Sequence, residues 1–179
     1  VFHKPPDAAV DVSAEGARLP FPTKTENLAW EAELVFAIGK EGEEVTNADA
    51  SGYIFAYGAG VDLTKRDLQD AAKQMRRPWC TSKGFDRSAP VGALLPAERF
   101  DRTGGEICMK VNGDVKQQST LSRMIWSPEE IVVYISNYYR LMPGDLVFTG
   151  TPAGVGRLSP GDLCESIVDG LPPCRFTIG

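Results

Sequence analysis

The sequence predicts a β-rich α+β domain whose sheets pack against each other. Three observations support this fold class: segments of strand character outnumber segments of helical periodicity, an Asn-Gly pair marks a tight hairpin, and two Pro-Gly pairs each precede a further strand. No linker divides the sequence, so we expect a single domain over residues 1–179. The expected strands are 34–39, 54–61, 106–111, 115–119, 145–149, 163–168 and 174–178.

The composition limits the class of function. The chain has 179 residues, of which 42% are hydrophobic, enough for one domain with an interior. No stretch approaches the roughly 18 apolar residues of a membrane span, so we expect a soluble, cytoplasmic protein. The formal net charge of −5, without a long basic tract, argues against nucleic acid and favours a small-molecule partner. Four cysteines without C-x-x-C spacing predict reduced, mostly buried thiols.

The segment WEAELVFAIG places Glu31 and Glu33 at the start of an apolar run. If residues 30–38 form a strand, both side chains point to one face, because side chains alternate along a strand. Two carboxylates about 7 Å apart repel each other, and a divalent cation between them would relieve this. Carboxylate oxygens suit magnesium, manganese or calcium better than zinc. The alternative is an edge strand that shows two solvated acids.

A third acid, Asp62, ends the expected strand 54–61 directly before the first expected helix. That helix, TKRDLQDAAKQMRR, begins with Thr64 as N-cap and Asp67 three residues later, as in a capping box, and Pro78 limits its extension. Its expected apolar stripe consists of Leu68, Ala71, Ala72 and Met75.

One face of this helix carries polar side chains that could bind an anion. Arg66, Gln69 and Lys73 recur at i, i+3 and i+7, and the face begins beside Asp62. The alternative is an ordinary solvated face on which Asp70 pairs with Arg66 or Lys73.

Two later segments have the character of functional loops. The segment RRPWCTSKGFDRSAPVG contains prolines and a glycine that interrupt regular structure, and it carries Lys83. The segment FTGTPAGVGRLSPGD leaves a strand through several glycines, which permit close backbone approach to a ligand. It lacks the lysine of a phosphate-binding loop, and no helix follows it as a dinucleotide fingerprint would require.

The second half of the sequence has clear turn and cap signals. Asn112-Gly113 predicts a type I′ hairpin turn, because this dipeptide tolerates positive φ. The second helix, SPEEIVVYISNYYRL, has Ser127 as N-cap, Pro128 at the first position and Glu130 closing a capping box. The segments RLMPGDLVF and RLSPGDLCE repeat one pattern and predict two turns that each feed a strand. The expected apolar stripe of the second helix consists of Ile131, Tyr134, Ile135 and Tyr138.

Five motifs together resemble the fumarylacetoacetate hydrolase family, in particular its bacterial acylpyruvate and fumarylpyruvate hydrolase branch. The motifs are FHKP, WEAELVFAIG, GVDLTKRDLQ, RPWCTSKGFDRSAP and GDLVFTGTPAGVG, in family order and at about family spacing. The resemblance implies a mixed β-sandwich or roll with a few short helices, usually as a homodimer. It also implies Mg²⁺ or Mn²⁺ held by Glu31, Glu33 and Asp62. By the same resemblance Lys83 lies beside the metal, while Arg66, Gln69 and Thr151 contact substrate.

The resemblance implies an enzyme of aromatic catabolism that hydrolyses a carbon–carbon bond in 2,4-dioxo acids, giving pyruvate and a carboxylic acid. A metal that withdraws electrons also serves tautomerisation, isomerisation or decarboxylation of oxaloacetate-like acids, and relatives with those activities share these motifs. A non-catalytic metal-binding relative without a lid is a further alternative. The acyl group and the choice between Mg²⁺ and Mn²⁺ stay open.

The start of the sequence departs from the hydrolytic pattern. Hydrolytic relatives carry a His-Glu pair on a mobile segment upstream of the FHKP motif, and that His activates water. Residue 1 is Val and the chain opens on an apolar pair, so we expect an upstream lid segment to be missing from this numbering. His3 does not match the catalytic His, and we expect it in a structural or rim position.

Overall fold

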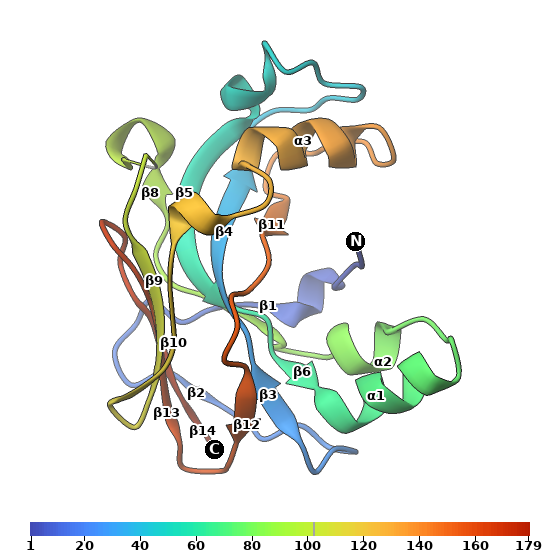
Figure 1. Ribbon diagram of the computed structural model, residues 1–179, viewed down its shortest axis with the longest axis vertical. Coiled ribbons are helices and arrows are strands. Elements are labelled where there is room, and N and C mark those ends of the chain that lie inside the picture. Colours follow the sequence, from blue (N-terminus) through green and yellow to red (C-terminus); the bar gives the residue numbers. More distant parts are fainter. Residues whose placement is uncertain (102) are drawn as a thin grey trace.

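Three sheets build the fold in the computed structural model, which describes residues 1–101 and 103–179 (Figure 1). A six-stranded sheet has the order β1-β7-β5-β4-β11, with β8 beside β5, and a five-stranded sheet has the order β10-β9-β13-β14-β2. The six-stranded sheet contains β1 (Ala9–Asp11), β4 (Ala32–Ile38), β5 (Ile54–Val61), β7 (Ala89–Val91), β8 (Leu95–Pro96) and β11 (Leu146–Phe148). The five-stranded sheet contains β2 (Arg18–Leu19), β9 (Glu106–Val111), β10 (Asp114–Thr120), β13 (Leu163–Val168) and β14 (Cys174–Ile178).

A small third sheet and several short helices complete the chain. The third sheet has the order β12-β3-β6 and contains β3 (Leu28–Trp30), β6 (Thr64–Lys65) and β12 (Gly156–Leu158). The helices are α1 (Arg66–Gln74), α2 (Cys80–Lys83) and α3 (Pro128–Ser136). Single 3₁₀ turns are η1 (Pro6–Ala8), η2 (Ala50–Tyr53), η3 (Ala97–Arg99) and η4 (Leu121–Arg123). The predicted β-rich α+β class is therefore confirmed.

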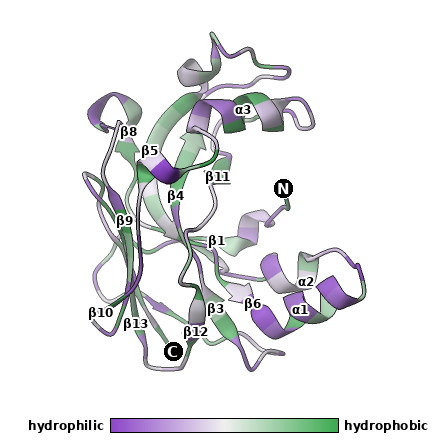
Figure 2. Cartoon of the chain, in the orientation of Figure 1, coloured by the Kyte–Doolittle hydropathy of each residue, from purple (hydrophilic) through white to green (hydrophobic). Residues whose placement is uncertain are grey.

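The core lies where the six-stranded and five-stranded sheets face each other. Phe36 of β4 and Tyr57 of β5 are fully buried, with ring centroids 6.4 Å apart, and Met109 of β9 and Phe176 of β14 are buried opposite them. Burying one such side chain stabilises the fold by about 1.5–3 kcal/mol. All seven residues of β4 are buried, which explains why its sequence is an almost continuous apolar run. Figure 2 shows β4 and β5 mostly in the hydrophobic colour, whereas α1 is mostly hydrophilic.

The turn and cap signals of the second half are confirmed. Asn112 and Gly113 have φ values of 53° and 85° and join β9 to β10, as a type I′ hairpin requires. The helix α3 begins with Ser127 accepting a hydrogen bond from the Glu130 N–H while the Glu130 side chain accepts one from the Ser127 N–H. Both Pro-Gly turns have their glycine, Gly144 or Gly161, at positive φ. These features depend on residues within a few positions, so the local sequence determines them.

The first helix differs from its prediction. It begins at Arg66 rather than at Thr64, because Thr64 pairs with Ala29 as part of β6. The Asp67 carboxylate accepts hydrogen bonds from the Thr25 hydroxyl and the Glu26 N–H instead of closing a capping box with Thr64. The expected stripe is only partly right: Ala72 is buried and Leu68 is half-buried, but Met75 is 57% exposed and Ala71 is exposed. Gln69, which lies outside the expected stripe, is buried.

The stripe predicted for α3 is partly wrong in the same way. Val132 and Ile135 are buried, but Tyr134 is 38% and Tyr138 is 67% exposed. Their rings pack on each other with centroids 5.2 Å apart, and they lie on the side of α3 that faces a large cavity.

The cysteines agree only in part with the prediction of mostly buried thiols. All four cysteines are free; Cys164 and Cys174 are buried, Cys108 is half-buried and Cys80 is exposed. Over residues 1–101 and 103–179, no helix has the length and apolar character that crossing a membrane requires.

Candidate metal centre

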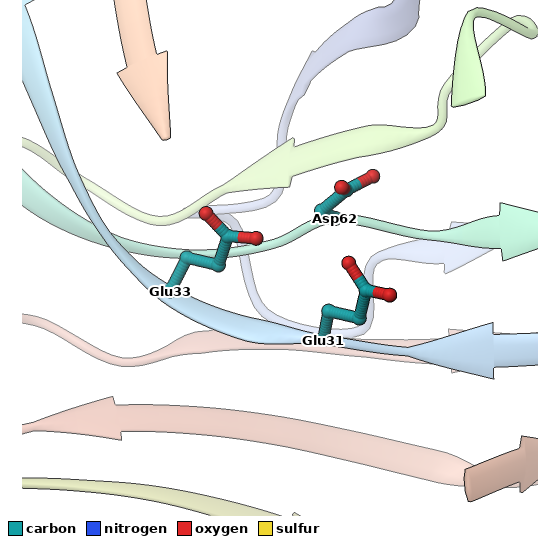
Figure 3. Close-up of side chains that lie close together, drawn as sticks. All are labelled: Glu31, Glu33 and Asp62. Atoms are coloured by element: carbon teal, nitrogen blue, oxygen red, sulfur yellow. The ribbon is translucent and has the colours of Figure 1, made fainter. Parts of the chain in front are cut away.

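The side chains of Glu31, Glu33 and Asp62 converge on one space (Figure 3). Each offers a carboxylate oxygen, and these oxygens lie within 4.8 Å of one another. The β4–β5 pairing causes this convergence, because Ala32 lies opposite Val61 and the Asp62 N–H donates to the Glu31 carbonyl at 2.8 Å. The strand expected over 30–38 is interrupted at Glu31, which lies between β3 and β4.

All three acids are buried, which contradicts the alternative of an edge strand with solvated carboxylates. Glu31 is 8%, Glu33 4% and Asp62 1% exposed. Removing several carboxylates from water is costly unless other charges compensate. The groups around them therefore decide what the site can hold.

Glu33 is the acid with the least compensation. Its Oε2 accepts a hydrogen bond from the Gly150 N–H at 2.6 Å, and no lysine or arginine nitrogen in the described part of the chain lies within ion-pair distance. Burial raises the pKa of Glu33 to about 8, and the neighbouring charge of Asp62 adds to the shift. A cation that entered this space would replace a proton on Glu33.

Glu31 is held by two cations. Arg66 Nη2 lies 2.6 Å from Oε1 and Lys83 Nζ lies 2.6 Å from Oε2. Burial alone would raise the pKa of Glu31, but the charges and hydrogen bonds of Lys83 and Arg66 together hold it below its usual value. Glu31 is therefore ionised at neutral pH and available as an anionic ligand.

Lys83 lies at the centre of the charged network. Its ammonium donates to Glu31 Oε2, Asp62 Oδ2 and the Thr64 hydroxyl, each at 2.6 Å, so all three hydrogens have an acceptor. The residue is 2% exposed and ends α2, a short helix inside the segment expected to be a long loop. The Thr64 hydroxyl thus serves Lys83 and does not cap α1.

Lys4 is a site residue that the sequence reasoning missed. Its Nζ lies 2.7 Å from Asp62 Oδ1 and donates to the Ser88 hydroxyl at 2.9 Å and to the backbone carbonyls of Leu63 and Ser88. Burial lowers the pKa of Lys4. Its position in the FHKP motif gave the only signal, because no local periodicity connects residue 4 with an acid 58 positions later.

Asp62 has one oxygen that is not hydrogen-bonded. Oδ1 is buried and, despite the nearby Lys4 ammonium, has no hydrogen-bond partner of suitable angle among the described residues. Burial raises the pKa of Asp62, and the charges of Lys4 and Lys83 oppose this shift. Three buried carboxylates that each offer an oxygen to one space are a donor set that fits a hard divalent ion such as Mg²⁺ or Mn²⁺.

The polar face of α1 is only partly directed to this centre. Arg66 Nη1 donates to Gln69 Oε1 at 2.5 Å while its Nη2 holds Glu31, and Gln69 is 3% exposed. Lys73 is exposed and lies 3.7 Å from Asp70, as the solvated-face alternative expected for that pair. Arg66 and Gln69 therefore belong to the site and Lys73 does not.

The glycine-containing loop after β11 contacts β4 beside Glu33. Thr149 donates to the Leu34 carbonyl at 2.9 Å, Gly150 donates to Glu33, and the Thr151 hydroxyl accepts from Gln117 Nε2 at 2.9 Å. Gly150 and Gly154 have φ values of 99° and 104°, which explains why the loop needs glycine there. Gln117 is a second residue that the sequence reasoning missed.

The centre opens into a cavity of about 1740 Å³. Glu31, Glu33, Asp62 and Lys83 line its charged end, and Gln69 and Thr151 lie on its wall. Aromatic side chains also line the cavity, among them Trp79, Trp126, Tyr134 and Tyr138. His3 lines the cavity with its ring 4.4 Å from that of Tyr139, and it is exposed, as expected for a rim position.

Comparisons with known proteins agree with the fold. The family model for the fumarylacetoacetate (FAA) hydrolase C-terminal domain matches residues 1–179. A fumarylpyruvate hydrolase of Ralstonia sp. is 39% identical over 178 residues, which cover 99% of this chain and 91% of that protein. The mitochondrial oxaloacetate tautomerase FAHD1 of Rattus norvegicus is 37% identical over 99% of this chain and 80% of its own length.

A solved structure adds a bound metal and a ligand. The crystal structure of fumarylpyruvate hydrolase from Pseudomonas aeruginosa in complex with Mn²⁺ and pyruvate superposes with a TM-score of 0.94 at 42% identity. The match covers 99% of this chain and 77% of that one. Because the family model spans every residue and the relatives match at full length of this chain, the protein belongs to the fumarylacetoacetate hydrolase family.

Proposed function

We propose that the protein is a divalent-metal-dependent hydrolase that cleaves a carbon–carbon bond in acylpyruvates, which are 2,4-dioxo acids, to give pyruvate and a carboxylic acid. The observation that carries the proposal is the convergence of three buried carboxylates beside Lys83 at the end of a large cavity. The similarity to fumarylpyruvate hydrolases supports the substrate class.

In this proposal Glu31, Glu33 and Asp62 hold Mg²⁺ or Mn²⁺. A bound ion supplies a Lewis acid that withdraws electrons from a chelating 2-oxo acid. The chain's own residues arrange the charge around it: Arg66 and Lys83 keep Glu31 ionised, and Lys4 and Lys83 bracket Asp62. Glu33 accepts one hydrogen bond from the Gly150 N–H, and its other lone pairs are assigned to the ion.

Substrate contacts are assigned to Arg66, Gln69 and Thr151. The Gln69 carbonyl oxygen already accepts from Arg66, so its NH₂ group is left to donate to a substrate oxygen. Thr151 lines the cavity and follows Gly150, whose N–H holds Glu33, and its hydroxyl is assigned to the substrate carboxylate. Two such donors would fix the orientation of a dioxo acid.

Lys83 is the proposed catalytic residue. Water adds to the acyl carbonyl, the bond between that carbon and the methylene carbon breaks, and the electron pair leaves with the pyruvate fragment as an enolate that then takes a proton. The Lys83 ammonium, fixed by three acceptors, is a pre-oriented positive charge that stabilises this developing anion. The base that takes the proton from water is assigned to the upstream His-Glu pair that the family resemblance implies.

The test is hydrolysis of 2,4-dioxopentanoate, followed by loss of its absorbance and by the release of pyruvate. The proposal expects turnover with Mn²⁺ or Mg²⁺, loss of turnover with EDTA, and recovery when the ion is restored. Glu33→Gln is the matched variant and is expected to be inactive. Absence of pyruvate release from any tested 2,4-dioxo acid by metal-loaded protein carrying its upstream segment would rule the proposal out.

Tautomerisation of oxaloacetate is the second candidate function. The 37% identity to oxaloacetate tautomerase FAHD1 favours it, and enol–keto exchange needs the cation and Lys83 but no attacking water. Oxaloacetate assayed in parallel separates the two: enol–keto exchange without pyruvate release from dioxo acids favours the tautomerase. Decarboxylation, isomerisation and a non-catalytic metal-binding role are the remaining outcomes of the same pair of assays.

The single catalytic domain, the cytoplasmic location and the homodimer stay predictions. Large exposed apolar side chains before and after α3 support a second copy as partner, because Ile125 is 93% and Tyr138 67% exposed. Light scattering coupled to gel filtration measures the mass directly.

A further inference from the structure

A buried glutamine connects the candidate metal centre with the loop that carries Thr151. Gln117 lies on β10, where it is 2% exposed although the strand is otherwise exposed or half-buried. The β9–β10 register shifts between Val115 and Gln117, and such a bulge re-aims side chains. The strand thus sends one polar side chain into the interior beneath the site.

Three hydrogen bonds fix the Gln117 amide. Its Oε1 accepts from the Ala32 N–H at 3.1 Å, and its Nε2 donates to Thr151 Oγ1 at 2.9 Å and to the Pro152 carbonyl at 2.7 Å. The Ala32 N–H can only donate and the Pro152 carbonyl can only accept, so the chemistry of the partners determines which end of the amide is oxygen. Both Nε2 hydrogens are used.

The direction of the bond to Thr151 has a consequence for the hydroxyl. A threonine hydroxyl has one hydrogen to donate and two lone pairs to accept. Gln117 donates to one lone pair of the Thr151 hydroxyl oxygen. The hydroxyl hydrogen of Thr151 is therefore not used in this bond and is left to point into the cavity that Thr151 lines. Gln117 itself does not line the cavity, so it acts through Thr151.

The bond to Ala32 places the same amide under the acids. Ala32 follows Glu31 and precedes Glu33, at the point of β4 beyond the last pairing with β11, which is Phe148 with Val35. Gln117 therefore satisfies a backbone N–H that no neighbouring strand reaches on that side. One side chain connects the backbone between two candidate ligands with the hydroxyl of Thr151.

We propose that Gln117 is a positioning residue that fixes Thr151 as a hydrogen-bond donor to an oxygen of the bound 2-oxo acid. This inference rests on the proposed function for its ligand class. It assigns no contact between Gln117 and substrate. The Gln117–Thr151 bond acts on ligand affinity and turnover, whereas the bonds to Ala32 and Pro152 act on the backbone.

The test is a double-mutant cycle with two versions of residue 151. Gln117→Met keeps the side-chain length but removes all three bonds. In wild-type and Thr151→Ser backgrounds, which keep the hydroxyl, it is expected to lower kcat/KM for 2,4-dioxopentanoate by roughly tenfold or more. In the Thr151→Val background, which lacks the hydroxyl, the same change is expected to cost less than about threefold, because residues that act through one another are non-additive.

The control is Gln74→Met, an exposed glutamine at the end of α1, which is expected to leave kcat/KM unchanged. Thermal stability is expected to fall in all three backgrounds, because Ala32 and Pro152 lose their partner in each. If Gln117→Met does not fold, Gln117→Glu replaces it in the cycle, since its carboxylate still accepts from the Ala32 N–H. Equal losses in the Val and Ser backgrounds would overturn the inference.

A binding arm separates this inference from the proposed hydrolysis. The dissociation constant of pyruvate is measured by calorimetry on Mn²⁺-loaded protein with the same variants. If the wild type hydrolyses no dioxo acid but the cycle in pyruvate affinity is non-additive, the proposed function fails and the role of Gln117 stands. Additive pyruvate affinities, or no pyruvate binding by wild type, would refute the role of Gln117.

Discussion

The buried carboxylate of Glu33 accepts the backbone N–H of Gly150 at 2.6 Å, while its two acidic neighbours, Glu31 and Asp62, are the ones held by cations. The loop after β11 is thereby joined to β4 through the one acid whose charge is least compensated. Several measurable properties follow from this asymmetry.

Glu33→Gln is expected to stabilise the metal-free protein at alkaline pH. The pKa of Glu33 is about 8 in the folded protein, which is above its value in the unfolded chain. The neutral form of Glu33 therefore contributes stability at low pH, and this contribution is lost progressively as the pH rises from about 4.5 to 8. Glutamine keeps an oxygen for Gly150 without the charge. In EDTA, melting temperatures should favour the variant at pH 9 and converge near pH 5. The exposed Glu15→Gln control should show no such trend, and a variant less stable than wild type at pH 9 would contradict the expectation.

Metal affinity is expected to increase with pH. Binding requires ionised carboxylates, so below the Glu33 pKa of about 8 the ion must displace at least one proton. The apparent Mn²⁺ association constant should rise about tenfold per pH unit below pH 8 and level off above it. Titration calorimetry in buffers of different ionisation enthalpy reports the protons released. Release of no proton at pH 6.5 would contradict the expectation that a protonated Glu33 becomes a ligand.

Lys83→Met is expected to slow chemistry more than it changes metal binding. The ammonium touches two candidate ligands, but it is their counter-ion and is not itself a ligand. We expect kcat to fall by about 10²-fold or more, the effect of removing one pre-oriented electrostatic group, and the Mn²⁺ dissociation constant to change less than about tenfold. Lys116→Met, at an exposed ion pair with Asp114, serves as the control. Equal losses in both quantities would make Lys83 part of the binding site alone.

Lys4→Met is expected to destabilise the metal-free protein. It leaves Asp62 buried with one fewer cation, and removing one partner of a buried ion pair costs about 3–5 kcal/mol. Chemical denaturation in EDTA measures the change. Lys40→Met, which removes an exposed ammonium stacked on Tyr53, should cost less than about 1 kcal/mol. Similar free energies of unfolding for the two variants would exclude a structural role for Lys4.

Gly156→Ala is expected to destabilise the segment between β11 and β12, which carries Thr151 and ends at Gly156. A Cβ at Gly156 would lie 2.4 Å from the Trp30 ring, whose Nε1 donates to the Gly154 carbonyl at 3.1 Å. Overpacking of this kind costs about 1–3 kcal/mol. Gly104→Ala, where a Cβ meets nothing within 4 Å, is the matched control for the melting temperature. Equal melting temperatures would show that Trp30 moves freely.

The sequence was most informative where short-range chemistry decides the structure. The Asn112-Gly113 turn was predictable because these two residue types prefer positive φ. The Ser127 cap was predictable because its hydrogen bond reaches only to Glu130, three residues later. The α1 cap failed because Thr64 has a tertiary partner, Lys83, that outweighs its local role. The α3 stripe failed because periodicity does not distinguish a core face from a cavity wall, as Tyr138 shows.

The candidate site was predictable only in part for the same reason. Glu31 and Glu33 share a strand, so their proximity follows from alternation, but their closeness to Asp62 depends on how β4 pairs with β5. Lys4 and Gln117 contact the centre from distant segments without any local pattern. The family resemblance supplied the roles that local sequence could not.

The pairing of Ala32 with Val61 also bears on the order of events when the chain folds. Glu31 and Asp62 meet only after β4 and β5 have paired in register, so the ion-binding site is not assembled before this pairing. Interactions absent from the folding transition state act mainly on the unfolding rate. A bound cation would therefore slow unfolding of the native protein and would not speed up folding.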